Sequence, residues 1–389
     1  MPKPTPTTIP QNPLSQSLTT PPPPSAGRIF LHSQFCTKPQ RLSLTPSTTL
    51  TNQTALITGG NAGLGYHAAR HLLSLNLSRL ILAVRSPAKG EEAARVLRRD
   101  FPRARVEVWE LEMGGYESVM GFVERVKGEF GNGNGNGKGD GEDAKGEKKK
   151  RLDMVILNAG MMGAEFMKDK QTGHCQVVQV NYLSTFLLAI LLLPILRTTN
   201  TSTTGQQQNR KPGRLTIVSS GGVFAGAKLP NRGERPFLAS FDTPPSPTQP
   251  FDVQERYFGS KALGHLFFVR LLPYLPPASE VIVNLVDPGF CKGTQLHREA
   301  EGFASAMWAV GKAVTGRSLE DGAWTYVDAV VAKGEESHGC FLMDWKIFGF
   351  YYAVYEPEGE ELMDVLFEET MAELEFAGIR GILEGLKQK

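Results

Sequence analysis

The sequence predicts an α/β fold, a single doubly wound domain built on a seven-stranded, mostly parallel sheet with helices on both faces. Two observations predict it. Short apolar runs alternate along the chain with longer amphipathic segments, which is the pattern of strand and helix units that wind a parallel sheet. The chain of 389 residues is 41% hydrophobic and 9% aromatic, a composition that allows one large core.

Each short apolar run is predicted as a strand, and each longer segment between two runs as a crossover helix. The strands are expected at residues 54–58, 80–84, 106–111, 154–157, 215–218, 281–286 and 340–343. The helices are expected near 63–75, 87–99, 115–130, 174–197, 254–275 and 319–333. Crossovers between parallel strands are right-handed, which limits how these helices can be placed. A further helix near 359–386 could pack on its own domain or on a partner, so the sequence leaves open whether the protein forms a homo-oligomer.

Low-complexity segments bound and interrupt this domain. Residues 1–27 are rich in Pro, Thr and Ser and are expected to form a flexible, disordered tail before a domain at 28–389. Inserts at 131–151 and 198–213 fall between a helix and the next strand, where they extend surface loops. The Pro-rich insert at 229–252 follows the fifth strand, so it is either part of a substrate wall or a plain surface insertion.

The charge balance argues against a nucleic-acid partner. With 42 basic and 40 acidic residues the net charge is +2, which provides no overall field to attract nucleic acid or an anionic membrane. The basic run from Lys148 to Arg151 could bind a polyanion, but a solvated flank before an apolar strand explains it better. We therefore assign this run no function.

The cysteines and the apolar runs indicate the compartment. Cys36, Cys175, Cys291 and Cys340 are widely spaced without a Cys-x-x-Cys pair, which argues against a disulfide framework and against a metal site. The N-terminus lacks the basic start and apolar run of a secretory signal. The longest apolar run, 186–196, is shorter than the ~20 residues that span a bilayer. We expect a cytoplasmic protein without a membrane span.

A glycine-rich segment joins the first strand to the first helix. It reads Thr-Gly-Gly-Asn-Ala-Gly-Leu-Gly over residues 58–65, and its position between strand and helix is typical of a nucleotide-binding loop. Gly59 would make the tight turn, Gly63 would let the backbone approach a pyrophosphate, and Gly65 would let the helix pack against the strand. The other loop residues assigned to this site are Asn61 and Leu64. A glycine-rich turn without a ligand is the alternative.

The end of the second strand indicates which cofactor is bound. Arg85 offers a guanidinium and no carboxylate where the ribose of an adenosine is expected, which favours a 2′-phosphate and therefore NADP(H). An ordinary surface arginine is the alternative. Glu112, after the third strand, could reach the adenine edge or be a solvated glutamate.

Tyr257 and Lys261 are four residues apart, so on the predicted helix they share a face, one turn apart. A phenol with a pKa near 10 is a poor acid or base at neutral pH, and an adjacent ammonium would lower that pKa. Ser219 and Ser220 end the fifth strand, where a serine could hydrogen-bond a substrate oxygen beside the phenol. The alternatives are a surface Tyr and Lys, and an ordinary strand-ending turn.

Six motifs occur at matching places in the predicted strands and helices. They are residues 58–65, Asn158-Ala159-Gly160, Asn181, Val218-Ser219-Ser220, Tyr257 with Lys261, and Asp287-Pro288-Gly289. In this order they make the chain resemble the short-chain dehydrogenases/reductases over residues 31–386. The resemblance implies that the doubly wound domain is of the Rossmann type.

The resemblance also implies roles for residues of this chain. Tyr257 would act as the general acid in reduction, and Lys261 would lower its pKa and bond the nicotinamide ribose. Ser220 would position the carbonyl, and Asn181 would hold a water that links Lys261 to solvent. The remaining cofactor contacts would be Asn158, Ala159 and Gly160 on the adenosine side, together with Pro288, Gly289 and Thr294.

Within this family the chain looks most similar to retinol-dehydrogenase-like and fungal secondary-metabolite reductases. The phrases that carry this similarity are Ala83-Val84-Arg85, residues 286–291 and Ser337-His338-Gly339. Three features depart from the family pattern. The interval from Ser220 to Tyr257 is unusually long, Thr294 lies one residue too far from Pro288, and Glu112 replaces a frequent aspartate.

We therefore expect an NADP(H)-dependent enzyme that transfers hydride between NADPH and a carbonyl or alcohol substrate, with a role in secondary metabolism. A non-catalytic NADP(H)-binding sensor or scaffold with the same fold is the alternative. Phe224, Phe290, Trp308 and Tyr326 either form a hydrophobic pocket lid around residues 290–320 or belong to the core.

Overall fold

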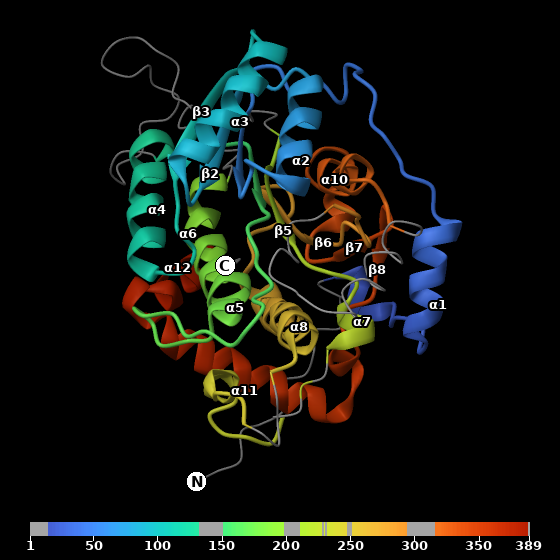
Figure 1. Cartoon of the computed structure of the whole chain (residues 1–389), viewed down its shortest axis with the longest axis vertical. Helices are drawn as coiled ribbons and strands as arrows, with labels where there is room; N and C mark the ends of the chain where they lie inside the picture. Colours follow the sequence, from blue (N-terminus) through green and yellow to red (C-terminus); the bar gives the residue numbers. More distant parts are fainter. Residues whose placement is uncertain are drawn as a thin grey trace.

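Eight strands form one sheet, in the order β3-β2-β1-β4-β5-β6-β7-β8 (Figure 1). The computed structural model describes residues 15–131, 151–197, 211–227, 229, 232–246, 251–293 and 316–387. The strands are β1 Thr54–Thr58, β2 Arg79–Val84, β3 Arg105–Glu110, β4 Met154–Leu157, β5 Gly213–Val218, β6 Val281–Val286, β7 Phe341–Met343 and β8 Lys346–Phe348. Neighbouring strands from β3 to β7 run parallel, and β8 pairs antiparallel with β7. The predicted doubly wound, mostly parallel sheet is confirmed.

The predicted number of strands is wrong by one, because β8 was missed. It has only three residues and follows a tight turn in which Asp344 and Trp345 both have positive φ, 53° and 62°. Two-residue hairpin turns of this kind usually carry Asn or Gly, which tolerate that conformation. Without those residues the local sequence gives no hairpin signal.

Two groups of helices cover the two faces of the sheet (Figure 1). The helices are α1 Ala26–Leu31, α2 Gly63–Ser74, α3 Pro87–Asp100, α4 Tyr116–Phe130, α5 Gln176–Val178, α6 Thr185–Leu196, α7 Val223–Gly226, α8 Val253–Leu271, α10 Leu319–Val327, α11 Pro357–Glu373 and α12 Ile379–Leu386. Leu56 of β1 packs in a core with α4, α6 and α8, whereas its neighbours Ala55 and Ile57 pack with α2, α3 and α10. Burial on both faces explains why the central strands read as continuous apolar runs.

The helix predicted at 174–197 extends from Gln176 to Leu196 and contains a π-helical turn, Gln179–Ser184, between α5 and α6. By length and composition it could cross a membrane, but 89% of its most apolar stretch is buried inside the protein. Leu187, Leu188 and Leu192 are fully enclosed by the sheet and by neighbouring helices. The helix therefore has the environment of a core helix.

The N-terminal segment differs from the predicted tail. From Ser15 onward it is packed on the body of the protein, with a short 3-10 helix, Gln16–Thr19, and then α1. The hydroxyl of the buried Ser17 accepts a hydrogen bond from Phe341 N at 3.0 Å. Composition alone could not show this, since the partners lie more than 300 residues away in sequence. Residues 1–14 lie outside the described part.

The inserts fall partly outside the described residues, which exclude 132–150 and 198–210. In the Pro-rich insert, Phe237 and Phe241 are buried, and Glu369 of α11 accepts hydrogen bonds from Phe237 N at 2.8 Å and Leu238 N at 2.6 Å. The described residues of this insert do not line the cavity discussed below. They therefore behave as an insertion packed on α11.

Candidate functional site

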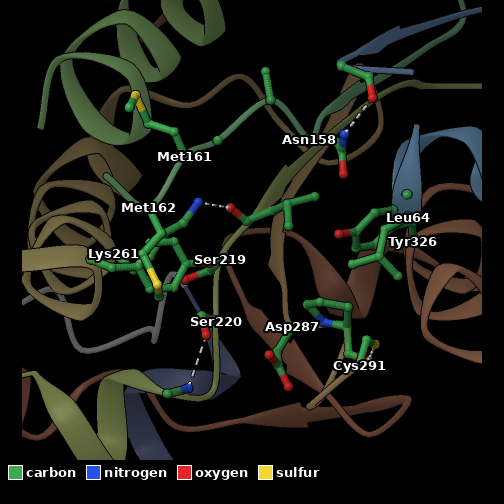
Figure 2. A pocket seen from close by; sticks show the side chains of 18 of the residues that line it. Leu64, Asn158, Met161, Met162, Ser219, Ser220, Lys261, Asp287, Cys291 and Tyr326 are labelled. Atoms are coloured by element: carbon green, nitrogen blue, oxygen red, sulfur yellow. Dashed lines mark hydrogen bonds between the residues drawn. The ribbon is translucent and has the colours of Figure 1, made fainter. Parts of the chain in front are cut away.

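A cavity of about 1180 Å³ lies where the parallel strands end (Figure 2). Residues that follow the carboxyl ends of β1, β2, β3, β4, β5 and β6 all line it. The chain winds from β1 toward β3 on one side and from β4 toward β6 on the other, so the cavity straddles the point where the strand order reverses. Ligands of doubly wound sheets bind at this switch point.

The glycine loop between β1 and α2 has the geometry of a phosphate cradle. Gly59 and Gly63 have positive φ, 65° and 55°, and among the described residues no heavy atom lies within 4 Å of a Cβ built on Gly63. A Cβ on Gly65 would lie 2.5 Å from the Gly59 carbonyl oxygen, so this position requires glycine for packing. The helix is preceded by Ala62, whose methyl group cannot cap its first N–H groups. Asn61 and Leu64 of this loop line the cavity.

The loop after β4 is fastened to this cradle. Asn158 Nδ2 donates to the carbonyl oxygens of Thr58 at 2.9 Å and Gly59 at 3.2 Å, and Ala159 N donates to Thr58 Oγ1 at 2.9 Å. Both residues line the cavity, but the amide hydrogens of Asn158 hold the neighbouring loop (Figure 2). A Cβ on Gly160 would lie 3.7 Å from Lys261 Nζ. This loop therefore runs from the glycine cradle toward the predicted catalytic lysine.

The rim of the cavity carries two basic side chains. Arg85 follows β2 and is 80% exposed, with its Nε 3.7 Å from Glu112 Oε2. Lys89, in the first turn of α3, also lines the cavity and was not predicted. The sequence contained a sign that Lys89 has a function, because the first turn of a helix favours acidic residues and a lysine there opposes the helix dipole. Arg85, Lys89 and the N-terminus of α3, capped by Ser86, make this rim attractive to an anion.

Tyr257, Lys261 and Ser220 meet at the other end of the cavity. The helix α8 begins after Asp252, whose Oδ1 accepts hydrogen bonds from Gln254 N and Glu255 N, both at 2.9 Å. Lys261 Nζ lies 6.0 Å from the centre of the Tyr257 ring and donates to Val218 O at 2.9 Å. The predicted helical spacing therefore places phenol and ammonium on one face.

Burial shifts the pKa of both groups. It raises the pKa of Tyr257 above its ordinary value of 10; the carboxylate of Asp287 raises that pKa further, and a hydrogen bond with Ser220 lowers it. Burial lowers the pKa of Lys261 to about 8. Burial, Asp287 and Ser220 account for the shift in the Tyr257 pKa, and the effect of Lys261 on that pKa stays a prediction. The phenol is held in its protonated form.

The two serines after β5 have different partners. Ser219 Oγ lies 2.8 Å from Nε2 of the buried His265. Since Nδ1 of His265 accepts from Tyr351 N at 3.1 Å, Nε2 carries the hydrogen and donates it to Ser219. Ser220 Oγ accepts from Gly222 N at 3.1 Å and is hydrogen-bonded to the Tyr257 side chain. The geometry therefore favours Ser220 over Ser219 as the partner of the phenol.

Asn181 lies in the π-helical turn and is buried. Its Oδ1 accepts from Met161 N at 2.8 Å, while its Nδ2 donates to Met161 O at 2.8 Å and to Ser260 Oγ at 3.0 Å. Ser260 in turn donates to the Tyr257 carbonyl at 2.7 Å. Both amide hydrogens are thus used within the protein, and Asn181 ties the loop after β4 to α8.

Asp287 belongs to the Asp287-Pro288-Gly289 motif, but no role was predicted for its side chain from the sequence. It is buried, and it accepts hydrogen bonds from Gly221 N at 2.7 Å and Gly289 N at 2.9 Å. Burial raises the pKa of its carboxyl to about 6. The side chain therefore links the loop that carries Ser220 to the loop after β6.

The loop after β6 contains Pro288 and Gly289, and both line the cavity. Gly289 has a φ of 77°, and a Cβ there would lie 2.3 Å from Arg317 Nη1, so glycine is required. Thr294 and Trp308 lie outside the described residues. The other aromatic candidates, Phe224, Phe290 and Tyr326, all line the cavity, although Phe224 and Tyr326 are also buried in the core.

Known proteins resemble this chain in sequence. A family model described as short chain dehydrogenase matches residues 53–134. The short chain dehydrogenase/reductase mfmJ of Annulohypoxylon moriforme is 46% identical over 358 residues, 92% of this chain and 94% of the relative. The short chain dehydrogenase virL of Hypocrea virens is 37% identical, over 92% of this chain and 95% of the relative.

Solved structures resemble it in fold. A short chain dehydrogenase from Pseudomonas syringae superposes with a TM-score of 0.53 at 18% identity, covering 78% of this chain and 99% of that chain. An NADPH-dependent 3-quinuclidinone reductase from Rhodotorula rubra gives a TM-score of 0.51 at 20% identity, over 82% and 98%. The sequence relatives extend over nearly all of the chain, and the solved structures have the same fold. The chain belongs to the short-chain dehydrogenase/reductase family.

Proposed function

We propose that the protein is an NADP(H)-dependent oxidoreductase that reduces a ketone or an aldehyde to an alcohol, or catalyses the reverse reaction. One observation carries the proposal. Tyr257, Ser220 and Lys261 meet at one end of a single cavity whose other end is the glycine cradle. A nicotinamide dinucleotide would extend from the glycine cradle to the catalytic end of the cavity, and bound NADPH would supply the hydride.

Residues of the protein would transfer the proton. The Tyr257 hydroxyl donates it to the carbonyl oxygen as that oxygen gains negative charge, and Ser220 adds a hydrogen bond to the same oxygen. The raised pKa of Tyr257 keeps the phenol protonated before a substrate binds, which is the form that a general acid needs. Lys261, with a pKa of about 8, is mostly an ammonium at neutral pH and can hydrogen-bond a ribose hydroxyl.

The preference for NADP(H) rests on the rim. Arg85 and Lys89 provide two cationic groups beside the N-terminus of α3, where a 2′-phosphate would be bound. Glu112, 3.7 Å from Arg85, would compete for the guanidinium in the absence of that phosphate. The resemblance to fungal secondary-metabolite reductases supports the further proposal that the substrate belongs to secondary metabolism.

The direct test measures NADPH oxidation with a panel of apolar ketones and aldehydes, for the unaltered protein and for Tyr257→Phe. Loss of the phenolic proton should lower kcat at least about 100-fold, the usual contribution of a general acid. NADPH binding, followed by fluorescence, should be retained. Tyr274→Phe is the matched control, because Tyr274 stacks on Phe367 beyond the described cavity lining.

The outcomes separate the candidate functions. Retained turnover in Tyr257→Phe would remove this tyrosine from the mechanism. NADPH binding without turnover of any carbonyl or alcohol by the unaltered protein would favour the non-catalytic sensor or scaffold.

A further inference from the structure

The N-terminal segment, residues 15–36, forms a wall of the cavity although it precedes the first strand of the sheet. Five of its side chains line the cavity: Ala26, Ile29, Phe30, Ser33 and Gln34. Three of these residues lie on α1, and the other two lie in the π-helical turn His32–Cys36 that follows it. The helix α1 contacts α7, the short helix that begins three residues after Ser220 (Figure 1). The segment therefore borders the catalytic end of the cavity.

The first half of the segment is anchored on the β7–β8 hairpin and on the chain after it. Besides the bond between Ser17 and Phe341 N, the Tyr355 hydroxyl donates to Ser17 O at 2.5 Å. The Tyr352 hydroxyl donates to Pro23 O at 2.8 Å. Gly349 approaches the segment so closely that a Cβ there would lie 2.4 Å from Thr20 O. These contacts fix the chain immediately before α1.

The second half is anchored by a buried polar network. Ser33 Oγ donates to Asp344 Oδ1 at 2.8 Å, and Arg317 Nη2 donates to Ser33 O at 2.8 Å. Arg317 also forms an ion pair with Asp344, and all three side chains are buried. Breaking one partner of such a network leaves a buried charge or polar group unsatisfied. Since α1 is fixed at both ends, its side chains are held over the cavity.

The helix presents an aromatic side chain at the cavity mouth. Ile29 is only 6% exposed and packs in the core, which sets the rotation of the helix. Phe30, next to it, is 39% exposed, lines the cavity, and packs edge-on against Phe290 with ring centres 5.7 Å apart. Leu31 is 56% exposed and lies outside the described cavity lining. Phe30 and Phe290 thus form an aromatic pair that leaves apolar surface facing the cavity.

We propose that α1 is a specificity element for the carbonyl substrate. Phe30, together with Phe290, covers the apolar part of the substrate that extends away from Ser220 and Tyr257. The preferred substrates are then carbonyl compounds with an apolar body larger than the reacting group, because only such a body reaches α1 and removes the Phe30 surface from water. This inference rests on the proposed reductase function, which supplies the reacting end of the site.

The test compares Phe30→Ala with Leu31→Ala on acetaldehyde, on benzaldehyde and on a series of 4-alkylbenzaldehydes of increasing chain length. Phe30→Ala should raise KM for the longest aldehydes about tenfold, while kcat/KM for acetaldehyde changes less than about twofold. Leu31→Ala should match the unaltered protein throughout. Equal effects of both variants on all aldehydes, or no effect of Phe30→Ala on the long ones, would overturn the proposal. Circular dichroism and NADPH binding check that each variant is folded.

A second measurement does not depend on turnover. In the Tyr257→Phe background with NADP⁺ present, Phe30→Trp should change its emission when a long 4-alkylbenzaldehyde is added, and Leu31→Trp should not. A change in emission without any turnover by the unaltered protein would refute the proposed reductase but support the binding wall. Turnover by the unaltered protein with no change in Phe30→Trp emission would refute the binding wall alone.

Discussion

At the scale of single residues, the proposed preference for NADP(H) rests on Arg85, which lines the cavity beside Glu112. We expect Arg85→Asp to lower the preference for NADPH over NADH at least about tenfold, or ~1.4 kcal/mol, because a carboxylate repels the 2′-phosphate and accepts from a ribose hydroxyl. The measurement is kcat/KM for both cofactors with one carbonyl substrate. Arg103→Asp is the control, since Arg103 is exposed and lies outside the described lining of the cavity. An unchanged ratio in Arg85→Asp would exclude a 2′-phosphate at this position.

Asp287 should act on the reaction through Tyr257. Its carboxylate contributes to the raised pKa of Tyr257, so the neutral Asp287→Asn removes that contribution. The alkaline limb of the pH profile of carbonyl reduction should therefore move to lower pH. The substitution also replaces the acceptor for Gly289 N or Gly221 N, so kcat should fall. A profile that keeps its alkaline limb in place would show that Asp287 has a structural role alone.

The sequence was sufficient to predict site residues that lie close together along the chain. Tyr257 and Lys261 share a helix face, and the glycines of residues 58–65 lie in one turn, so both could be read from neighbouring positions. His265 and Lys89 were missed for different reasons. The partners of His265 are 46 and 86 residues away, a pairing that no local pattern reveals. Lys89 belongs to no motif at the end of a strand, since it lies in the first turn of α3.

One partly buried cluster joins elements far apart in the sequence. His174, just before α5, lies with Nδ1 2.7 Å from Asp242 Oδ2 and Nε2 3.1 Å from Glu373 Oε1. Burial alone would lower the pKa of His174, but hydrogen bonds and charges of the two carboxylates raise it to about 9. Tyr116 of α4 also donates to Glu373 Oε1, at 3.0 Å. The cluster holds α4, α11 and the Pro-rich insert together.

This cluster should make stability depend on pH. A histidine whose pKa rises from about 6.5 unfolded to about 9 folded stabilises the fold fully below pH 6.5, and that stabilisation is lost as the pH rises to 9. His174→Ala should therefore lower the free energy of unfolding by about 2 to 3 kcal/mol at pH 6, and by clearly less at pH 9. Urea unfolding at both pH values measures this. His32→Ala, at an exposed histidine, is the control. A loss independent of pH would show that His174 is neutral in the fold.

At the scale of elements the sequence predicted what periodicity and burial dictate. Strands buried on both faces appear as apolar runs, and all seven predicted ones are present within two residues of their expected bounds. Prediction from the sequence failed for elements that depend on contacts with distant residues. The three residues of β8 are a strand only because β7 pairs with them, and residues 15–27 are ordered by contacts with the hairpin region.

At the scale of the whole molecule, the C-terminal helices pack on their own domain. The helices α11 and α12 contact α8 and α6, and Leu366 and Leu383 are fully buried. They thus cover the outer faces of the helices that carry Lys261 and follow Asn181 (Figure 1). The sequence left open which surface the C-terminal helix covers, because an amphipathic terminal helix gives no sign of it.

Segments far apart along the described chain line the proposed site. The sheet supplies the loops that would hold a dinucleotide, α8 supplies Tyr257 and Lys261, and the segment before the sheet adds α1. We propose that hydride passes from NADPH to a carbonyl carbon in this cavity while Tyr257 provides the proton.

Hydride transfer is tested most directly with NADPH that carries deuterium at either face of nicotinamide C4. Mass spectrometry of the alcohol formed from an apolar aldehyde should show one deuterium on the former carbonyl carbon for one labelled face alone. Tyr257→Phe should form this product at least about 100-fold more slowly. An alcohol without deuterium from either labelled cofactor, or an equal rate in Tyr257→Phe, would contradict the account.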